Sequence, residues 1–100
     1  MRVNVISRPA LNEFAVKHPD SKTALDAWYK TARKAQWRSL TEVKRVYPRA
    51  DLVGTCTVFN IAGSKYRLVT KIKYAQQVIY ICNVLTHPDY SRGKWKDECS

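Results

Sequence analysis

The sequence predicts an α+β fold in which N-terminal helices pack on one face of a small antiparallel β-sheet. Two changes along the chain support this class. Apolar residues recur at the helical period of 3.6 in the first half, and after Pro48 they alternate with a period of two. The chain has 100 residues, of which 45% are hydrophobic, which suffices for one core but not for two. We therefore expect a single domain.

The chain begins with a short β-prone segment, residues 3–6, and a first helix follows. Ser7 is the expected N-cap of this helix, and Pro9 its first residue, where the missing N–H of proline is not needed. An apolar stripe at helical spacing starts at Leu11 and stops near His18, just before the next proline. The apolar side of this helix is expected to cover the sheet.

The second helix is the longest one predicted and reaches to about Trp37, because apolar residues keep the helical period up to that point. Asp20 or Ser21 is its expected N-cap. Ser39 and Glu42 have the spacing of a capping box, which predicts a short third helix beginning there.

Three strands are expected in the second half, at residues 55–61, 65–74 and 77–84, with short turns between them. Two tight hairpins would join them into an antiparallel meander. The last segment, residues 93–100, is polar, so we expect a loosely ordered tail after a domain of residues 1–92.

The middle strand carries the clearest charge pattern. Side chains alternate between the two faces of a strand, which places on one face Lys65, Arg67, Val69, Lys71 and Lys73. The intervening positions are mostly apolar and should face the helices. The ordinary explanation for such a charged face is solvation that protects against aggregation. Positive charge alone on one face is better explained by phosphate binding, because like charges repel.

His87 directly follows the third predicted strand, in a loop that Pro88 stiffens. An isolated histidine is more often structural than catalytic. Here it lies at the edge of the sheet, and histidine readily exchanges protons near neutral pH. Tyr90 is close in sequence and can stack on a base or bind a phosphate. The other histidine, His18, ends a helix and is expected to have no chemical role.

The charge of the whole chain points to a polyanionic partner. Eighteen Lys and Arg against eight Asp and Glu give a net charge of +10. Nucleic acid suits this charge better than a membrane, because the chain has neither an apolar run of transmembrane length nor a long helix with a bulky apolar face.

The three cysteines suggest a reducing cytoplasm. Cys56, Cys82 and Cys99 lack the paired spacing of a disulfide framework or a zinc site, and the N-terminal residues contain no apolar signal core. Cys56 and Cys82 are expected to be small core residues. No metal or cofactor is expected.

The remaining candidate chemistry is RNA cleavage. The sequence has no glycine-rich phosphate loop and few carboxylates for two-metal catalysis. RNA supplies its own nucleophile, the 2′-OH. An enzyme then needs only proton transfer and cations that stabilise the charge on phosphorus, which a basic site with one histidine can provide.

Several motifs, in order along nearly the whole chain, resemble the HigB-type toxins of bacterial toxin–antitoxin systems, within the RelE-like mRNA interferases. They are ISRPAL at 6–11, AWY at 27–29, VFNIAGSKYRL at 58–68 and THPDY at 86–90. The resemblance implies a RelE-like fold and a ribosome-dependent endoribonuclease that cleaves mRNA in the bacterial cytoplasm. It also implies a helix-turn-helix antitoxin similar to HigA, through which alone the toxin would meet operator DNA.

The resemblance also implies roles for individual residues. Arg67 falls where these toxins place a phosphate-binding arginine, His87 where relatives place a residue close to the scissile phosphate, and Tyr90 at the aromatic position after it. The further positions expected to bind RNA, whose lysines are assigned mainly from the charged face, are Asn60, Lys65, Lys71 and Lys73. The cations on the outer face of the second helix, expected to contact ribosomal RNA, are Lys30, Arg33, Lys34 and Arg38.

Two other interpretations remain. A basic RNA- or ribosome-binding module without catalysis predicts the same charge and fold, but no special need for His87. A DNA-binding repressor is weaker, because the basic second helix is not preceded by the turn and partner helix of a helix-turn-helix. A neighbouring gene encoding a small helix-turn-helix protein would favour the toxin.

Overall fold

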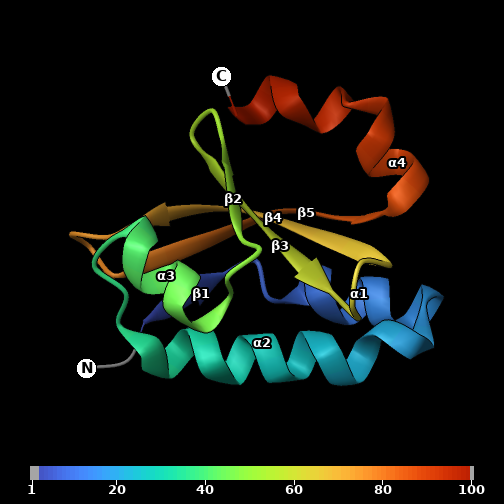
Figure 1. The fold of residues 1–100 in the computed structure, drawn as a ribbon. Helices are drawn as coiled ribbons and strands as arrows, with labels where there is room; N and C mark the ends of the chain where they lie inside the picture. Colours follow the sequence, from blue (N-terminus) through green and yellow to red (C-terminus); the bar gives the residue numbers. More distant parts are fainter. Residues whose placement is uncertain (1–2, 100) are drawn as a thin grey trace.

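A computed structural model describes residues 3–99 of the protein (Figure 1). Residues 1, 2 and 100, at the outer ends of the predicted domain and tail, lie outside the described part. The elements follow one another in this order: β1 (Asn4–Ile6), α1 (Pro9–Lys17), the 3-10 helix η1 (Pro19–Ser21), α2 (Lys22–Ala35), α3 (Leu40–Val46), β2 (Asp51–Val53), β3 (Cys56–Ile61), β4 (Tyr66–Lys73), β5 (Val78–Thr86), α4 (His87–Arg92) and the 3-10 helix η2 (Lys94–Cys99).

The strands in the described part of the chain form one five-stranded sheet in the order β1-β5-β4-β3-β2. Strands β3, β4 and β5 pair antiparallel, which confirms the predicted meander. The sheet is mixed, however, because β1 pairs in parallel with the first residues of β5. The edge strand β2 was not predicted, since three residues are too few to show an alternating pattern.

The sheet lies between two layers (Figure 1). Helices α1 and α2 cover one face, as the sequence predicted, and α4 with η2 lies over the other. None of the helices described for residues 3–99 is both long and apolar enough to cross a membrane.

The larger core lies between the sheet and the N-terminal helices. Leu25, Trp28 and Ala32 recur along one side of α2, and each is at most 1% exposed. They pack in one cluster with Phe59 and Leu68 from the sheet, where the ring centroids of Trp28 and Phe59 are 5.4 Å apart. Full burial of a large apolar side chain contributes about 1.5–3 kcal/mol. This core therefore anchors the strands that carry the candidate site.

The start of α1 differs from the prediction that Ser7 caps it. Ser7 has a positive φ of 72°, and the N-cap position falls on Arg8, which makes no side-chain cap. The backbone carbonyl of Ser7 instead accepts a hydrogen bond of 3.0 Å from the N–H of Ala10. Pro9 does begin the helix, and α1 ends beside His18 as expected.

The predicted side-chain cap of α2 is also wrong. Ser21 occupies the N-cap position, but its hydroxyl donates to the carbonyl of His18 at 2.7 Å. The Asp20 carboxylate is likewise engaged elsewhere, by the Tyr66 hydroxyl at 2.6 Å and by the Lys65 ammonium. Ser21 is thus engaged by a local contact within its own turn, and Asp20 by tertiary contacts with Lys65 and Tyr66.

The capping residue of α3 is confirmed. The Ser39 hydroxyl accepts the N–H of Glu42 at 3.4 Å, as a capping box requires. The Glu42 carboxylate accepts from the N–H of Arg38, one residue before the position expected for a full box.

The expectation of a loosely ordered C-terminal tail is wrong. Element η2 packs against the face of the sheet opposite α1 and α2, with Trp95 and Cys99 only 5% and 2% exposed. Cys99 forms a disulfide with Cys56 of β3, which the cysteine spacing did not predict, whereas Cys82 is free. A buried Trp and Cys explain the order of a segment that is polar at its other positions. The tail therefore belongs to the folded domain.

Candidate active site

Strand β4 places Arg67 on the face of the sheet opposite α1 and α2. Arg67 pairs with Asn60 of β3 and with Leu85 of β5, and directly opposed residues share a face. The half-buried Arg67 side chain donates from Nη1 to the carbonyl of Ser64 at 2.6 Å, and more weakly to that of Tyr66 at 3.3 Å. These bonds hold the guanidinium near the β3–β4 turn.

Tyr90 lies against the same guanidinium. Its ring centroid is 5.1 Å from Arg67 Cζ, within the range of a cation–π contact. Tyr90 belongs to α4, a short helix in a segment where the sequence predicts a loop. The helix forms because the Thr86 hydroxyl accepts the N–H of Asp89 at 3.4 Å and Pro88 occupies the first turn.

His87 is the first residue of α4 and is exposed. It lies three residues before Tyr90, so the two side chains share one side of the short helix. The Nδ1 atom of His87 lies 3.5 Å from the Ser91 hydroxyl, a weak contact that leaves Nε2 without a described partner. A cation, an aromatic ring and a solvent-accessible imidazole thus gather around the end of β5.

The lysines of β4 are distributed more widely than the strand pattern suggested. Lys71 and Lys73 share the Arg67 face, but Lys71 is four residues from Arg67, about 13 Å along an extended strand. Lys65 lies elsewhere, because its ammonium forms an ion pair with Asp20 on the helix side of the sheet. Arg67 and Asn60 are therefore the predicted RNA-binding residues nearest Tyr90 on this face.

The pKa values of the Asp20 cluster shift in the directions that these contacts require. Hydrogen bonds from Lys65 and then Tyr66 lower the pKa of the Asp20 carboxyl below its ordinary value. The same carboxylate raises the pKa of Lys65 and of Tyr66. The cluster joins η1 to the start of β4, which indicates a structural role.

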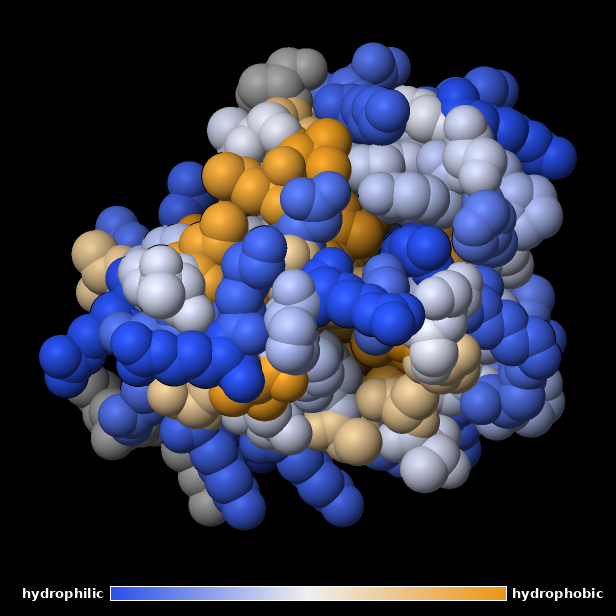
Figure 2. All heavy atoms as spheres, in the orientation of Figure 1, coloured by the Kyte–Doolittle hydropathy of each residue, from blue (hydrophilic) through white to orange (hydrophobic). Residues whose placement is uncertain are grey.

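The basic residues of the second helix lie on the other side of the molecule. Helix α2 is separated from α4 by the sheet (Figure 1). Lys30, Lys34 and the following Arg38 are exposed, and the half-buried Arg33 has its guanidinium 5.4 Å from the ring centroid of Tyr29. The structure therefore does not bring the α2 cations together with Arg67. They form a second basic surface. In Figure 2, long hydrophilic side chains project from the lower edge of the molecule, where Figure 1 places α2.

Comparison with known proteins decides the family. Residues 21–93 match the family model HigB_toxin, described as the RelE-like toxic component of a toxin–antitoxin system. This chain belongs to the HigB toxin family. The chain is 32% identical over 91 residues to the mRNA interferase toxin HigB of Escherichia coli K12 and to the mRNA interferase HigB of Shigella flexneri, covering 88% of each chain. It is 19% identical over 93 residues to the mRNA interferase HigB of Escherichia coli O6:H1.

Family membership confirms the expectations of a HigB-type toxin and an α+β fold. As a toxin of a toxin–antitoxin system, this HigB-family protein has an antitoxin as its partner. The family match contains Arg67, His87 and Tyr90 and ends at residue 93. Most of the C-terminal segment lies beyond it.

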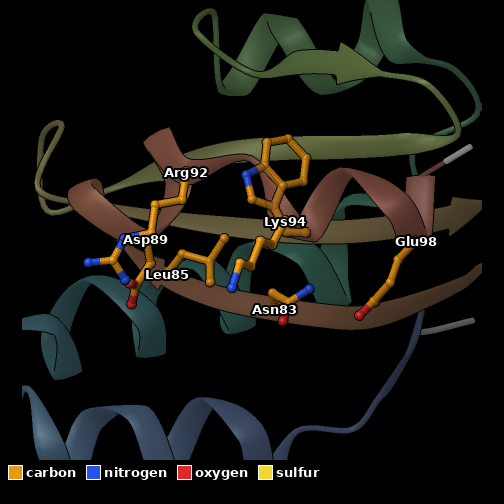
Figure 3. Close-up of a pocket in the computed structure, with 7 residues that line it drawn as sticks. Asn83, Leu85, Asp89, Arg92, Lys94 and Glu98 are labelled. Carbon is orange, nitrogen blue, oxygen red and sulfur yellow. The ribbon is translucent and has the colours of Figure 1, made fainter.

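A cleft opens beside the candidate site of this HigB-family toxin. It measures about 310 Å³ and lies between β5, which contributes Asn83 and Leu85, and the C-terminal segment (Figure 3). Asp89 and Arg92 on its wall form an ion pair at 2.8 Å. Trp95 also lines the cleft.

Sequence reasoning missed Trp95, which stacks on Tyr90 with centroids 4.8 Å apart. A tryptophan within a polar tail was the available signal, because large aromatic side chains are seldom left fully exposed.

The side chains of the described residues bear on whether the site could hold a metal. Among residues 3–99, no three His, Cys, Asp or Glu side chains come together in a way that could hold a metal ion. The groups that converge near Tyr90 are suited to anion binding by a guanidinium and to proton exchange by an imidazole.

Proposed function

We propose that this toxin is an endoribonuclease that cleaves mRNA on the ribosome, at the surface formed by Arg67, His87 and Tyr90. The observation that carries the proposal is the arrangement of the guanidinium of Arg67 against the ring of Tyr90, with His87 on the same side of α4. The names of the relatives, mRNA interferases, support the substrate. The net charge of +10 suits an RNA-rich target.

In the proposed reaction, the ribose 2′-oxygen attacks the adjacent phosphorus. The 2′-O–P bond forms as the P–O5′ bond breaks, the 2′-OH loses its proton, and the 5′-oxygen gains one. The products are a 2′,3′-cyclic phosphate, or the 3′-phosphate formed from it by hydrolysis, and a 5′-hydroxyl. Arg67 binds the phosphate oxygens and stabilises the added charge. His87 exchanges a proton with one of the two reacting oxygens.

The other residues proposed to contact RNA are assigned from their positions relative to Arg67. Asn60 lies beside Arg67 in register, so it can reach the same nucleotide. Lys71 and Lys73 extend the positive face along β4 toward neighbouring phosphates. Lys65 is held by Asp20 and contributes less than the sequence pattern suggested. Cleavage by the 2′-OH needs no cofactor.

The antitoxin is proposed to be a helix-turn-helix protein similar to HigA. In this arrangement the antitoxin contacts operator DNA, and the toxin reaches DNA only as part of their complex.

The test is cleavage of a defined mRNA by purified toxin, with and without ribosomes and with enough EDTA to chelate free metal while leaving the ribosome intact. We expect cleavage with ribosomes and products ending in a 2′,3′-cyclic or 3′-phosphate. His87→Ala should reduce the rate by about a hundred- to ten-thousand-fold, as loss of a positioned acid or base does, while ribosome binding remains. Products ending in a 3′-hydroxyl would contradict the mechanism. Ribosome binding without any cleavage by the wild-type protein would favour the non-catalytic binding module.

A further inference from the structure

Trp95 contacts Tyr90 in two ways. The two rings stack with centroids 4.8 Å apart and planes 15° from parallel. The indole Nε1–H also donates to the backbone carbonyl of Tyr90 at 2.9 Å. One side chain therefore restricts both the ring and the backbone of Tyr90.

Tyr90 in turn contacts Arg67. The guanidinium carbon of Arg67 is 5.1 Å from the centroid of the Tyr90 ring. Beyond this ring, the described contacts of the guanidinium are hydrogen bonds to the carbonyls of Ser64 and Tyr66 in its own turn and strand. The orientation of Arg67 therefore depends in part on where Tyr90 lies.

Trp95 is itself anchored to the sheet. It is 5% exposed and packs in a cluster with Val58 and Val69. The end of its segment is fixed by the disulfide between Cys99 and Cys56 and by the N–H of Thr55, which donates to the Cys99 carbonyl at 2.7 Å. The contacts form a continuous path from β3 through η2 to Tyr90 and Arg67.

Close contact with the β2–β3 turn also constrains this path. Gly54 has a φ of +59°, and a Cβ built on it would lie 1.8 Å from the Cys99 carbonyl oxygen. Only glycine allows the turn to approach η2 so closely. The backbone of the β2–β3 turn at Gly54 thus restricts where the end of η2 can lie.

We propose that Trp95 is a positioning residue for RNA cleavage, which holds Tyr90 and, through it, the guanidinium of Arg67 at the place where the phosphate binds. The inference rests on the proposed function. It assigns a role in positioning the site to η2 (Lys94–Cys99), which lies beyond the family match. Trp95 is 5% exposed, so its role is to act through Tyr90 rather than to bind RNA.

The experiment compares single-turnover cleavage on ribosomes by the wild type, Trp95→Leu, Trp95→Phe, Tyr90→Ala and the double variant Trp95→Leu/Tyr90→Ala. Trp95→Leu should lower the cleavage rate at saturating ribosomes by about ten- to a hundred-fold, because small misplacements of a binding group cost that much. The ribosome concentration at half-saturation should change little. Trp95→Phe retains a ring that can stack on Tyr90, so it should recover most of the rate.

The double variant separates positioning from simple packing. If Trp95 acts through Tyr90, Trp95→Leu should cost little more once Tyr90 is already alanine, since residues in one contact chain are not additive. Leu25→Ala, which opens the core on the helix side of the sheet, is the matched control for lost stability. It should leave the rate of the folded fraction near that of the wild type.

The outcomes distinguish the two proposals. Wild-type protein that binds ribosomes but cleaves nothing would overturn the proposed function, and the positioning role with it. Wild-type cleavage accompanied by fully additive losses in the double variant would overturn the positioning role alone, as would an equal loss in Leu25→Ala. If Trp95→Leu does not fold, Trp95→Phe decides: near-complete recovery supports the role, and activity as low as that of Tyr90→Ala contradicts it.

Discussion

Arg67 combines a permanent positive charge with a planar guanidinium, and both properties determine its contacts in the structure. Its Nη1 donates to the Ser64 carbonyl while its plane lies near the Tyr90 ring. Lysine has the charge but neither the donor fork nor the flat surface. We therefore expect Arg67→Ala to abolish mRNA cleavage and Arg67→Lys to slow it by at least about tenfold, the effect of losing roughly 1.4 kcal/mol of transition-state binding.

The measurement is the cleavage rate on ribosomes, together with ribosome affinity. Lys17→Ala, which removes a charge from the exposed end of α1, is the matched control and should cleave as the wild type does. Full activity in Arg67→Lys would show that charge alone suffices at this position.

The contacts of Asp20, which join two parts of the fold, predict a pH-dependent contribution to stability. Its pKa is lowered, first by the hydrogen bond from Lys65 and then by that from Tyr66. Because the pKa of Asp20 is lower in the folded protein than in the unfolded chain, the ionised carboxylate stabilises the fold at pH values above the unfolded-state pKa. This stabilisation is lost as the pH falls through the folded-state pKa. Lys65 and Tyr66 set the alkaline limit of this stabilisation. Their pKa values are raised in the folded protein, so their contribution is lost as the pH rises through those folded-state pKa values.

Asp20→Asn should therefore lower the melting temperature between about pH 4 and pH 10, and the difference from the wild type should shrink below about pH 4. Thermal unfolding followed by circular dichroism across this range is the measurement. Asp26→Asn breaks the Lys22–Asp26 pair within α2 and should have a smaller effect, because it joins residues of one helix rather than two parts of the fold. A difference that grows toward acid pH would contradict the assignment.

At the scale of the elements, the sequence was most informative where a pattern repeats. The period of α2 and the alternation of β3, β4 and β5 predicted those elements and their meander correctly. Capping signals were less reliable, because other groups, local or distant in sequence, compete for the same side chains. Asp20 and Ser21 are good capping residues, yet Tyr66 and the His18 carbonyl bind them instead.

In the candidate site too, some features follow from local sequence patterns and others depend on contacts between residues far apart in the sequence. Arg67 could be placed on the cationic face because strand geometry fixes alternation, whereas the position of Asn60 beside it follows from the register of β3 and β4. The Lys65 side chain lies on the helix side of the sheet and not on the Arg67 face, because it pairs with Asp20. A local sequence pattern could not predict this partner, which is 45 residues away. The order of the C-terminal segment depends on burial of Trp95 and on the pairing of Cys56 with Cys99, both of which are long-range events.

Helix α2 provides an element-scale test of ribosome docking. Its exposed side carries Lys30, Arg33 and Lys34 on the opposite side of the sheet from Arg67. Replacing all three by Glu should weaken ribosome association at moderate salt by at least about tenfold, because each neutralised phosphate contributes through counterion release. The fold should persist, since none of the three lies in the core.

Sedimentation with ribosomes over a range of salt concentrations measures this effect. The wild type should lose affinity more steeply with salt than the triple variant, because it neutralises more phosphates. Ribosome affinity and salt dependence equal to the wild type would remove α2 from the interface.

At the scale of the whole molecule, the two basic surfaces lie on opposite sides of a small, compact body. The radius of gyration is 12.5 Å, and the shortest extent is 23 Å. A protein this small can contact structured ribosomal RNA with α2 while Arg67 and Tyr90 face the mRNA. If both surfaces act as proposed, an antitoxin that covers either of them would prevent cleavage on the ribosome.

This arrangement predicts the behaviour of the protein in cells. Induced alone in bacteria, the toxin should arrest growth and translation, and co-expression of its antitoxin, proposed above to be a helix-turn-helix protein, should restore both. Growth curves and amino-acid incorporation measure the effect. His87→Ala, produced at the same level, is the matched control and should allow growth, because it retains the charge surfaces and lacks the proton-exchanging group. Full growth with abundant folded wild-type toxin would contradict the toxic activity, whereas arrest by His87→Ala would show that toxicity does not require the His87 imidazole.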